Sequence, residues 1–141
     1  MKSRIIPLAV ILMVVGCGSL PSFPTAPAEL TSGVAVYEHA DFAGESAVIT
    51  EDQKNLKDVL GPCGEQSDEN GSGEVGWSDC MSSVRIAPGW RAILYRDDGF
   101  KGEQVEVTGD VPNLTQRPGT CSKGGLNDCV TSIRVFGPSG P

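Results

Sequence analysis

The chain reads YEHADFAGE at residues 37–45 and YRDDGFKGE at residues 95–103. Both stretches place tyrosine, phenylalanine, glycine and glutamate at the same spacing, so one local structure is written twice. The glycines at positions 44 and 102 argue against a helix and predict a folded hairpin with a positive φ angle. A repeated hairpin indicates a fold built from two equivalent units.

The repeat extends well beyond the hairpins. From Tyr37 to Tyr95 the offset is 58 residues, and the same offset aligns Asn55 with Asn113 and Cys63 with Cys121. Further along, WSDCMSSVRI (77–86) aligns with LNDCVTSIRV (126–135) at an offset of 49 residues. The smaller offset places a nine-residue insertion in the first copy, between Cys63 and residue 77. This segment is polar and glycine-rich, which is typical of an exposed loop.

Short apolar and β-branched runs in each copy predict strands. No stretch predicts a long helix, although NLKDVLG (55–61) allows one helical turn, so the sequence predicts an all-β protein. The expected strands are VAVYE (34–38), SAVI (46–49), SSVRI (82–86), RAILYR (91–96), QVEV (104–107) and TSIRVF (131–136).

The pattern Tyr-x-x-x-x-Phe-x-Gly, followed by x-Asp-x-x-(Ser/Thr)-Ser and an apolar-Arg-apolar strand, resembles the Greek key motif of the βγ-crystallin superfamily. The resemblance covers roughly residues 33–136, with motif one at about 33–87 and motif two at about 90–136. It implies a β-sandwich of eight strands in two four-stranded sheets. The two halves would be related by a pseudo-twofold axis, each sheet borrowing one strand from the other motif.

Microbial members of this superfamily bind Ca²⁺ through the stretch (Asn/Asp)-(Asn/Asp)-x-x-(Ser/Thr)-Ser. The second copy, NDCVTS (127–132), fits at every position, whereas SDCMSS (78–83) departs at Ser78. Oxygen ligands of this kind suit Ca²⁺, a hard cation. The resemblance implies one site from the carbonyls of Glu38 and Cys80 with the side chains of Ser82 and Asn127, and another from the carbonyls of Arg96 and Cys129 with the side chains of Thr131 and Ser78.

We expect the two sites to be unequal. A serine hydroxyl is a weaker Ca²⁺ donor than a carboxamide, so the site that uses Ser78 should be the weaker. Asp79 and Asp128 either ligate the ion or serve only as turn residues that hold the loop. Ser83 and Ser132 are predicted to be hydrogen-bonding struts beneath the hairpins. Some relatives keep the fold without the metal, so a metal-free domain is the alternative.

Four cysteines lie in the repeated region, and they allow three disulfide pairings. Each copy carries an equivalent pair, which favours Cys63–Cys80 and Cys121–Cys129. Each bond would close the loop that leads into the Asp-Cys segment, and closing such a loop stabilises by about 3 kcal/mol. A zinc site is the rival interpretation, but the spacing lacks paired CxxC motifs.

The beginning of the chain resembles a bacterial lipoprotein signal. Two basic residues precede the apolar run IIPLAVILMVVG, which ends at Cys17. We expect cleavage of residues 1–16 and lipidation of Cys17, with an ordinary secretory signal as the alternative. Residues 17–30 are proline-rich and predict a tether, and 31–141 form the domain. The protein is therefore expected in the cell envelope, held in a membrane, and Gly18 weakly favours the outer one.

Charge and composition narrow the function classes. The chain carries 11 basic and 18 acidic residues, and removal of Lys2 and Arg4 with the signal increases the negative charge. Binding to nucleic acid is not expected, because that affinity comes from basic groups on phosphates. Catalysis is not expected either, since the single histidine, His39, has no nucleophile motif around it. Trp77 aligns with Leu126 and is predicted to lie in the core.

The sequence thus predicts a lipid-anchored envelope protein whose βγ-crystallin-like domain binds Ca²⁺ for stability. One alternative is an inhibitor of secreted metalloproteases that presents the insertion at 64–76 as its binding loop. Another is a metal-free surface module that contacts an unidentified protein partner.

Overall fold

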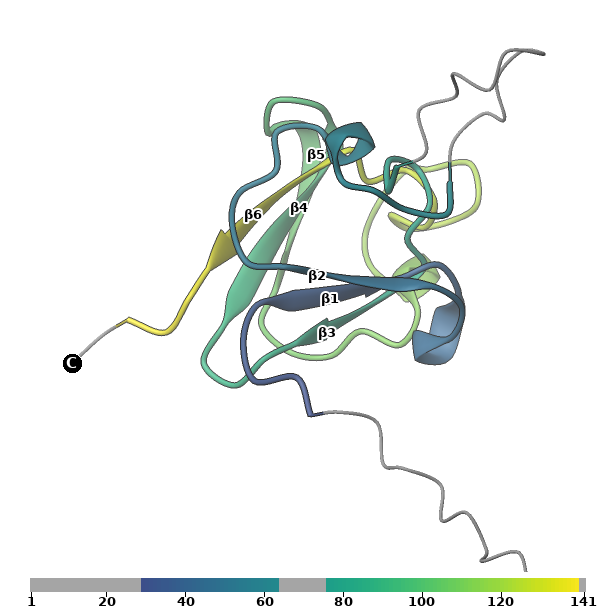
Figure 1. Cartoon of the computed structure of the whole chain (residues 1–141). Coiled ribbons are helices and arrows are strands. Elements are labelled where there is room, and N and C mark those ends of the chain that lie inside the picture. Colours follow the sequence, from purple (N-terminus) through teal and green to yellow (C-terminus); the bar gives the residue numbers. More distant parts are fainter. Residues whose placement is uncertain (1–28, 64–75, 140–141) are drawn as a thin grey trace, which may run out of the picture.

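The computed structural model describes residues 29–63 and 76–139. These residues form two three-stranded antiparallel sheets that pack against one another (Figure 1). The strands are β1 (Val34–Tyr37), β2 (Ser46–Ile49), β3 (Ser83–Ile86), β4 (Arg91–Asp97), β5 (Lys101–Val107) and β6 (Ser132–Phe136). All six coincide with predicted strands, within a few residues at their ends.

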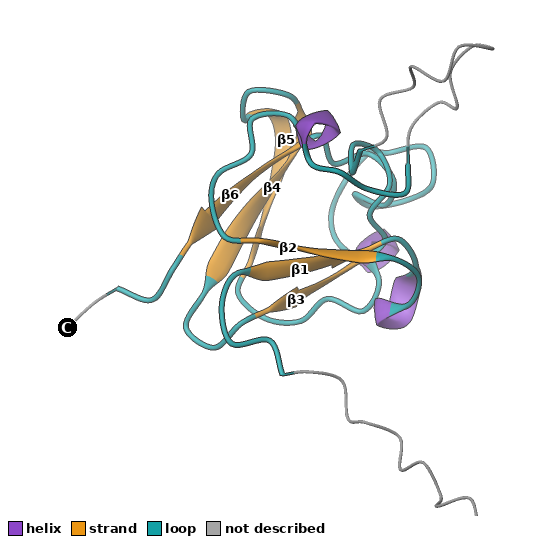
Figure 2. Ribbon diagram, viewed as in Figure 1, coloured by secondary structure: helices purple, strands orange, loops and turns teal. Residues whose placement is uncertain are grey.

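Each sheet belongs mainly to one copy of the repeat. The first has the order β2-β1-β3 and the second the order β5-β4-β6, so the earliest strand of each copy is central. Within the described residues, three short turns join the strands (Figure 2): η1 (Ala40–Phe42), in which Asp41 and Phe42 have positive φ angles, and the 3₁₀ turns η2 (Leu56–Asp58) and η3 (Leu114–Gln116). The turn predicted in residues 55–61 is η2, and η3 is its counterpart in the second copy.

The predicted exchange of strands between the two halves is present in reduced form. Gln53 of the first copy forms an isolated antiparallel bridge with Ile133 on β6, and Val111 of the second copy forms one with Val84 on β3. In each bridge both main-chain hydrogen bonds are made, at 2.8–3.0 Å. The fold class is confirmed, but the fourth strand expected in each sheet is a single bridge.

A carboxylate ends each bridge early. The Asp52 side chain accepts a hydrogen bond from the Val135 N–H at 2.9 Å, and the Asp110 side chain accepts one from the Ile86 N–H at 2.9 Å. The next donor on each strand is therefore satisfied by a side chain, so the bridge does not need to lengthen into a strand. Pro112, which lacks an N–H, follows the second bridge and also limits pairing.

The core lies between the two sheets and is dominated by aliphatic side chains. Trp77 is 1% exposed and Leu126 is fully buried, which confirms the predicted core position of the aligned pair. The Trp77 indole N–H donates to the Leu60 carbonyl at 3.0 Å, so its polar group is satisfied. The largest fully buried side chains are Trp77, Leu56, Met81, Leu94, Leu114, Leu126 and Ile133.

Candidate metal centre

Both folded hairpins rest on a buried serine. The Ser83 hydroxyl donates to the His39 carbonyl at 2.6 Å and accepts from the Phe42 N–H at 3.0 Å. Phe42 has a φ of 62°, a left-handed conformation that costs a non-glycine residue about 1–2 kcal/mol. Its ring packs edge-on against Tyr37, with 5.7 Å between the ring centroids, and this contact with the serine bonds offsets the strain.

The second hairpin repeats this arrangement at the same distances. Ser132 donates to the Asp97 carbonyl at 2.6 Å and accepts from the Phe100 N–H at 3.0 Å. Gly44 and Gly102 have φ values of 79° and 74°, as the sequence predicts for this turn. Ser83 and Ser132 are both fully buried, so their predicted role as struts is confirmed.

The loops that hold the predicted ligands are bonded to one another across the pseudo-twofold axis. The Asp79 N–H donates to the Val130 carbonyl at 3.1 Å, and the Asp128 N–H donates to the Met81 carbonyl at 3.2 Å. Both aspartates are left-handed, with φ values of 58° and 50°. Each loop therefore meets the other copy at its aspartate.

The second predicted site brings together oxygens from both copies. The Thr131 hydroxyl donates to the Asp79 carboxylate at 3.4 Å, and the Ser78 hydroxyl lies 3.1 Å from that carboxylate and 3.4 Å from Thr131. Arg96 and Cys129, whose carbonyls are the other predicted ligands, line the same hollow of about 440 Å³. Its remaining lining residues are Asn55, Lys57, Asp97 and Asp98.

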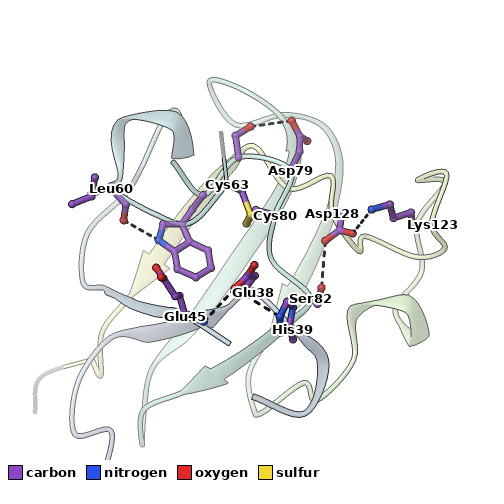
Figure 3. The surroundings of a disulfide bond; sticks show 12 residues. Glu38, His39, Glu45, Leu60, Cys63, Asp79, Cys80, Ser82, Lys123 and Asp128 are labelled. Atoms are coloured by element: carbon purple, nitrogen blue, oxygen red, sulfur yellow. Dashed lines mark hydrogen bonds and ion pairs between the residues drawn. A yellow bond between two sulfur atoms is a disulfide. The ribbon is translucent and has the colours of Figure 1, made fainter. Parts of the chain in front are cut away.

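The first predicted site is assembled differently. The Ser82 hydroxyl donates to the Asp128 carboxylate at 3.3 Å, and the Lys123 ammonium group pairs with the other oxygen of that carboxylate at 2.9 Å (Figure 3). The side chain that reaches Ser82 is Asp128, one position after the predicted Asn127, whose N–H donates to the Gly124 carbonyl at 3.2 Å.

The main chain brings the predicted carbonyls and hydroxyls together. The Ser82 N–H donates to the Tyr37 carbonyl and the Thr131 N–H to the Tyr95 carbonyl, both at 2.9 Å. Glu38 and Arg96, the next residues after these tyrosines, are thereby fixed beside the hydroxyl-bearing loops. Cys80 belongs to the same loop as Ser82.

The donor chemistry suits a hard cation. Hydroxyls, main-chain carbonyls and one carboxylate at each site are oxygen ligands that Ca²⁺ accepts. Across residues 29–63 and 76–139, no group of three histidine, cysteine, aspartate or glutamate side chains is placed to hold a metal. Neutral oxygens would therefore make up most of either site, and such sites bind Ca²⁺ with modest affinity.

The hairpin bends differ in charge between the copies. Arg96 pairs with Asp97 at 3.0 Å, and the guanidinium hydrogen bond lowers the pKa of Asp97 below its usual value. The same bond raises the pKa of Arg96. The first copy has Glu38 and His39 at these positions, 3.8 Å apart. The His39 side chain is 63% exposed, which places it in the solvent.

The cysteines pair as predicted. Cys63 bonds to Cys80, with Cα atoms 5.7 Å apart, and Cys121 bonds to Cys129, with Cα atoms 6.2 Å apart. These spacings lie within the normal range for disulfides. With all four sulfurs in disulfide bonds, no thiolate is left for the zinc site considered as the rival. Both bonds end at residues whose carbonyls are predicted ligands, so they restrain the candidate sites.

Three parts of the sequence interpretation fall outside the described residues. They are the signal segment with Cys17, most of the tether, and most of the insertion proposed as an inhibitory loop. Among the residues that are described, no helix has the length and apolar character needed to cross a membrane.

The architecture is that of a βγ-crystallin domain. A solved structure from work on the evolution of the eye-lens βγ-crystallin domain fold has a TM-score of 0.59 and 24% identity, covering 82% of this chain and 96% of that one. A βγ-crystallin domain from Flavobacterium johnsoniae has a TM-score of 0.52 and 29% identity, covering 77% of this chain and 98% of that domain.

Two curated proteins are also similar in sequence. A development-specific protein S homolog from Myxococcus xanthus is 30% identical over 105 residues, 74% of this chain and 48% of that protein. Spherulin-3A from Physarum polycephalum is 29% identical over 104 residues, 72% of this chain and 80% of that protein. The chain thus spans about half the length of the Myxococcus relative. No family model matches the sequence.

Sequence reasoning missed two features of the site. Nothing in the repeat marks Lys123 as a partner of Asp128. The repeat aligns Asn55 with Asn113 but does not indicate that Asn55 lines the second hollow. The structure explains the repeat: Asn55 and Asn113 cap η2 and η3, accepting from the N–H groups of Lys57 and Thr115 at 3.0 and 2.9 Å.

Proposed function

We propose that this protein is a calcium-binding module of the cell envelope, anchored through lipid on Cys17, and that Ca²⁺ stabilises its βγ-crystallin fold. The observation that carries the metal proposal is the meeting of Ser78 and Asp79 with Thr131, a residue from the other copy. An ion held there would bind both halves of the domain at once. Unfolding would separate its ligands.

The function follows from linkage between metal binding and folding. An ion that binds only the folded state stabilises it by RT ln(1 + [L]/Kd), about 2.7 kcal/mol at a hundredfold excess over Kd. Extracellular modules bind Ca²⁺ at about 10⁻⁴–10⁻³ M, and the neutral ligands here suit a modest affinity of this order. No residue is assigned a catalytic role, and nucleic acid is not a proposed partner.

Calorimetric titration with Ca²⁺ tests the metal proposal. The oxidised chain should release or absorb heat with Ca²⁺ and give no comparable signal with Mg²⁺, which demands a tighter octahedral site. Thr131→Ala should remove binding at the second site and Ser82→Ala at the first. Thr108→Ala, in the loop after β5, is the control and should bind like the unaltered chain. If the unaltered chain shows no Ca²⁺ binding, the metal proposal is wrong.

The anchoring proposal rests on the sequence of residues 1–17 and needs its own test. In a bacterial host, the unaltered protein should enter the detergent phase of a Triton X-114 separation, because two acyl chains hold a protein in a membrane stably. Cys17→Ala should move it to the aqueous phase. Detergent partition that is unaffected by the substitution would contradict lipidation.

A further inference from the structure

A positive charge of the protein itself lies at the first candidate site. The Lys123 ammonium group is 2.9 Å from one oxygen of the Asp128 carboxylate, and Ser82 donates to the other oxygen at 3.3 Å (Figure 3). Ser82 is one of the predicted calcium ligands. The ammonium group is therefore separated from a ligand hydroxyl by a single carboxylate.

The loop that carries Lys123 is short and cross-linked. The disulfide between Cys121 and Cys129 closes it over a sequence separation of 8 residues. Inside the loop, the Gly124 N–H donates to the Cys121 carbonyl at 2.9 Å, and the Cys121 N–H donates to the Gly125 carbonyl at 3.1 Å. These bonds fix the backbone of Lys123 in a tight turn beside Asp128.

The second site differs in this respect. Asp79, the counterpart of Asp128, receives hydrogen bonds from the hydroxyls of Ser78 and Thr131, and no ion pair joins it to a basic group in the described ranges 29–63 and 76–139. Arg96, which also lines this hollow, is engaged by Asp97 at 3.0 Å. Lys57 lines the hollow as well, but the polar partners of Asp79, Ser78 and Thr131 are one another and not Lys57, so it does not occupy the ligand carboxylate as Lys123 does.

We infer that Lys123 is a tethered cation that competes with Ca²⁺ at the first site, so that the second site fills first. This inference rests on the proposed calcium function. It reverses the order that the sequence alone suggests, in which Ser78 makes the second site the weaker. The ammonium group of Lys123 repels the divalent ion as one whole charge repels another. The serine at position 78 replaces one neutral ligand, a carboxamide, by another, a hydroxyl. The first effect is the larger, so the order of the sites is reversed.

The competition is partial. The Lys123 side chain is 68% exposed, and exposed ion pairs contribute little to stability, so the ammonium group can turn into solvent when an ion enters. Asp128 is 21% exposed and is held by Ser82, so it stays in place. Lys123 should therefore weaken the first site and not abolish it.

Calcium titration in a Thr131→Ala background isolates the first site of the full oxidised chain. In that background, Lys123→Met should bind Ca²⁺ about tenfold more tightly, as expected from removal of a unit charge beside a divalent ion near the surface. Arg91→Met is the matched control: Arg91 is also in an exposed 2.9 Å ion pair, with Glu106, but Glu106 and the ring of Phe136 on which Arg91 stacks belong to neither candidate site. It should leave the affinity unchanged.

The outcomes separate the inference from the proposed function. Equal affinities for Lys123→Met and Arg91→Met would overturn the inference while leaving calcium binding intact, and Lys123→Gln should repeat the result of Lys123→Met. Tighter binding for the Lys123 variants alone would support it. A lack of Ca²⁺ binding in the unaltered chain and in every variant would overturn both. Near-UV circular dichroism in EGTA shows whether each variant is folded.

Discussion

The two copies of the repeat agree closely in one region and diverge in another. Beneath the hairpins, Ser83 and Ser132 make the same pair of hydrogen bonds at 2.6 and 3.0 Å, although they lie 49 positions apart. The stacked arginines repeat too: Arg85 lies 4.3 Å from the ring of Phe42, and Arg134 lies 4.4 Å from the ring of Phe100.

The loops that face the candidate sites differ between the copies. Ser78 stands opposite Asn127 in the repeat, and Lys123 pairs with Asp128, whereas Asp79 has hydroxyl partners. The bend after each hairpin tyrosine carries Glu38 and His39 in one copy and Arg96 and Asp97 in the other. Positions that satisfy buried backbone groups are therefore kept by the requirements of folding. Positions exposed to solvent or to a ligand are free to differ.

The largest expected effect concerns the aligned core pair. Trp77→Ala should cost about 4 kcal/mol of unfolding free energy and Leu126→Ala about 3 kcal/mol, because both side chains are buried in the core. The tryptophan change also leaves the Leu60 carbonyl without its donor. Denaturant unfolding in EGTA measures both. Losses below about 1 kcal/mol would contradict the core assignment.

The struts should be equivalent in energy as they are in geometry. Ser83→Ala and Ser132→Ala should each cost about 2 kcal/mol, because each removes two hydrogen bonds of a fully buried hydroxyl, one to a main-chain carbonyl and one from a main-chain N–H. The same denaturant titration in EGTA compares them, with Ser78→Ala as a control that should change stability by less than about 0.5 kcal/mol. A large difference between the stability losses of the two variants would contradict the equivalence of the two serines.

The two helix-capping asparagines should differ slightly in how much they stabilise the fold. Asn55→Ala and Asn113→Ala should each cost about 1 kcal/mol through loss of the cap. Asn113 also accepts from the Thr115 hydroxyl at 2.7 Å, so its substitution should be the more costly of the two. The melting temperatures of the two variants in EGTA show which substitution costs more stability. A greater loss for Asn55→Ala in EGTA would contradict this ranking.

The smallest effect is expected at the Arg96–Asp97 pair. Arg96→Gln should raise the pKa of Asp97 toward its ordinary value, because the guanidinium hydrogen bond is the main cause of its lowering. Because the pKa of Asp97 is lower in the folded state, its ionised carboxylate stabilises the fold at pH values above 3.8, the pKa of the unfolded state. This contribution is lost as the pH falls through the lower folded pKa. Both side chains are exposed, so a carboxyl NMR titration is the suitable measurement. An unchanged pKa would show that Arg96 does not control Asp97.

Much of the fold could be predicted because its determinants are local and repeated. The glycines of the hairpins, the serines beneath them and the alternating apolar strands recur in register, and the disulfide pairs follow the same symmetry. The shortened fourth strands could not be predicted, since they depend on Asp52 and Asp110 capping neighbouring strands far away in sequence.

The candidate sites were predicted only in part. The motif predicts Ser78 and Thr131 at one site, and their hydroxyls lie 3.4 Å apart. It named Asp128 as a ligand or a loop-holding residue, but it assigned Asn127 to the site of Ser82 and gave no indication that Lys123 would reach Asp128. These contacts depend on how a cross-linked loop directs its side chains, which neither spacing nor residue type reveals.

Thermal unfolding of the oxidised chain in EGTA, in millimolar Ca²⁺ and in millimolar Mg²⁺ tests the central claim most directly. The unaltered chain should melt several degrees higher with Ca²⁺ than in EGTA, since about 1 kcal/mol of linkage raises Tm by about 4–8 °C in a domain of this size. Mg²⁺ should have little effect, and Thr131→Ala combined with Ser82→Ala should abolish the rise. Identical curves with Ca²⁺ and with EGTA would contradict the calcium account and favour a metal-free module.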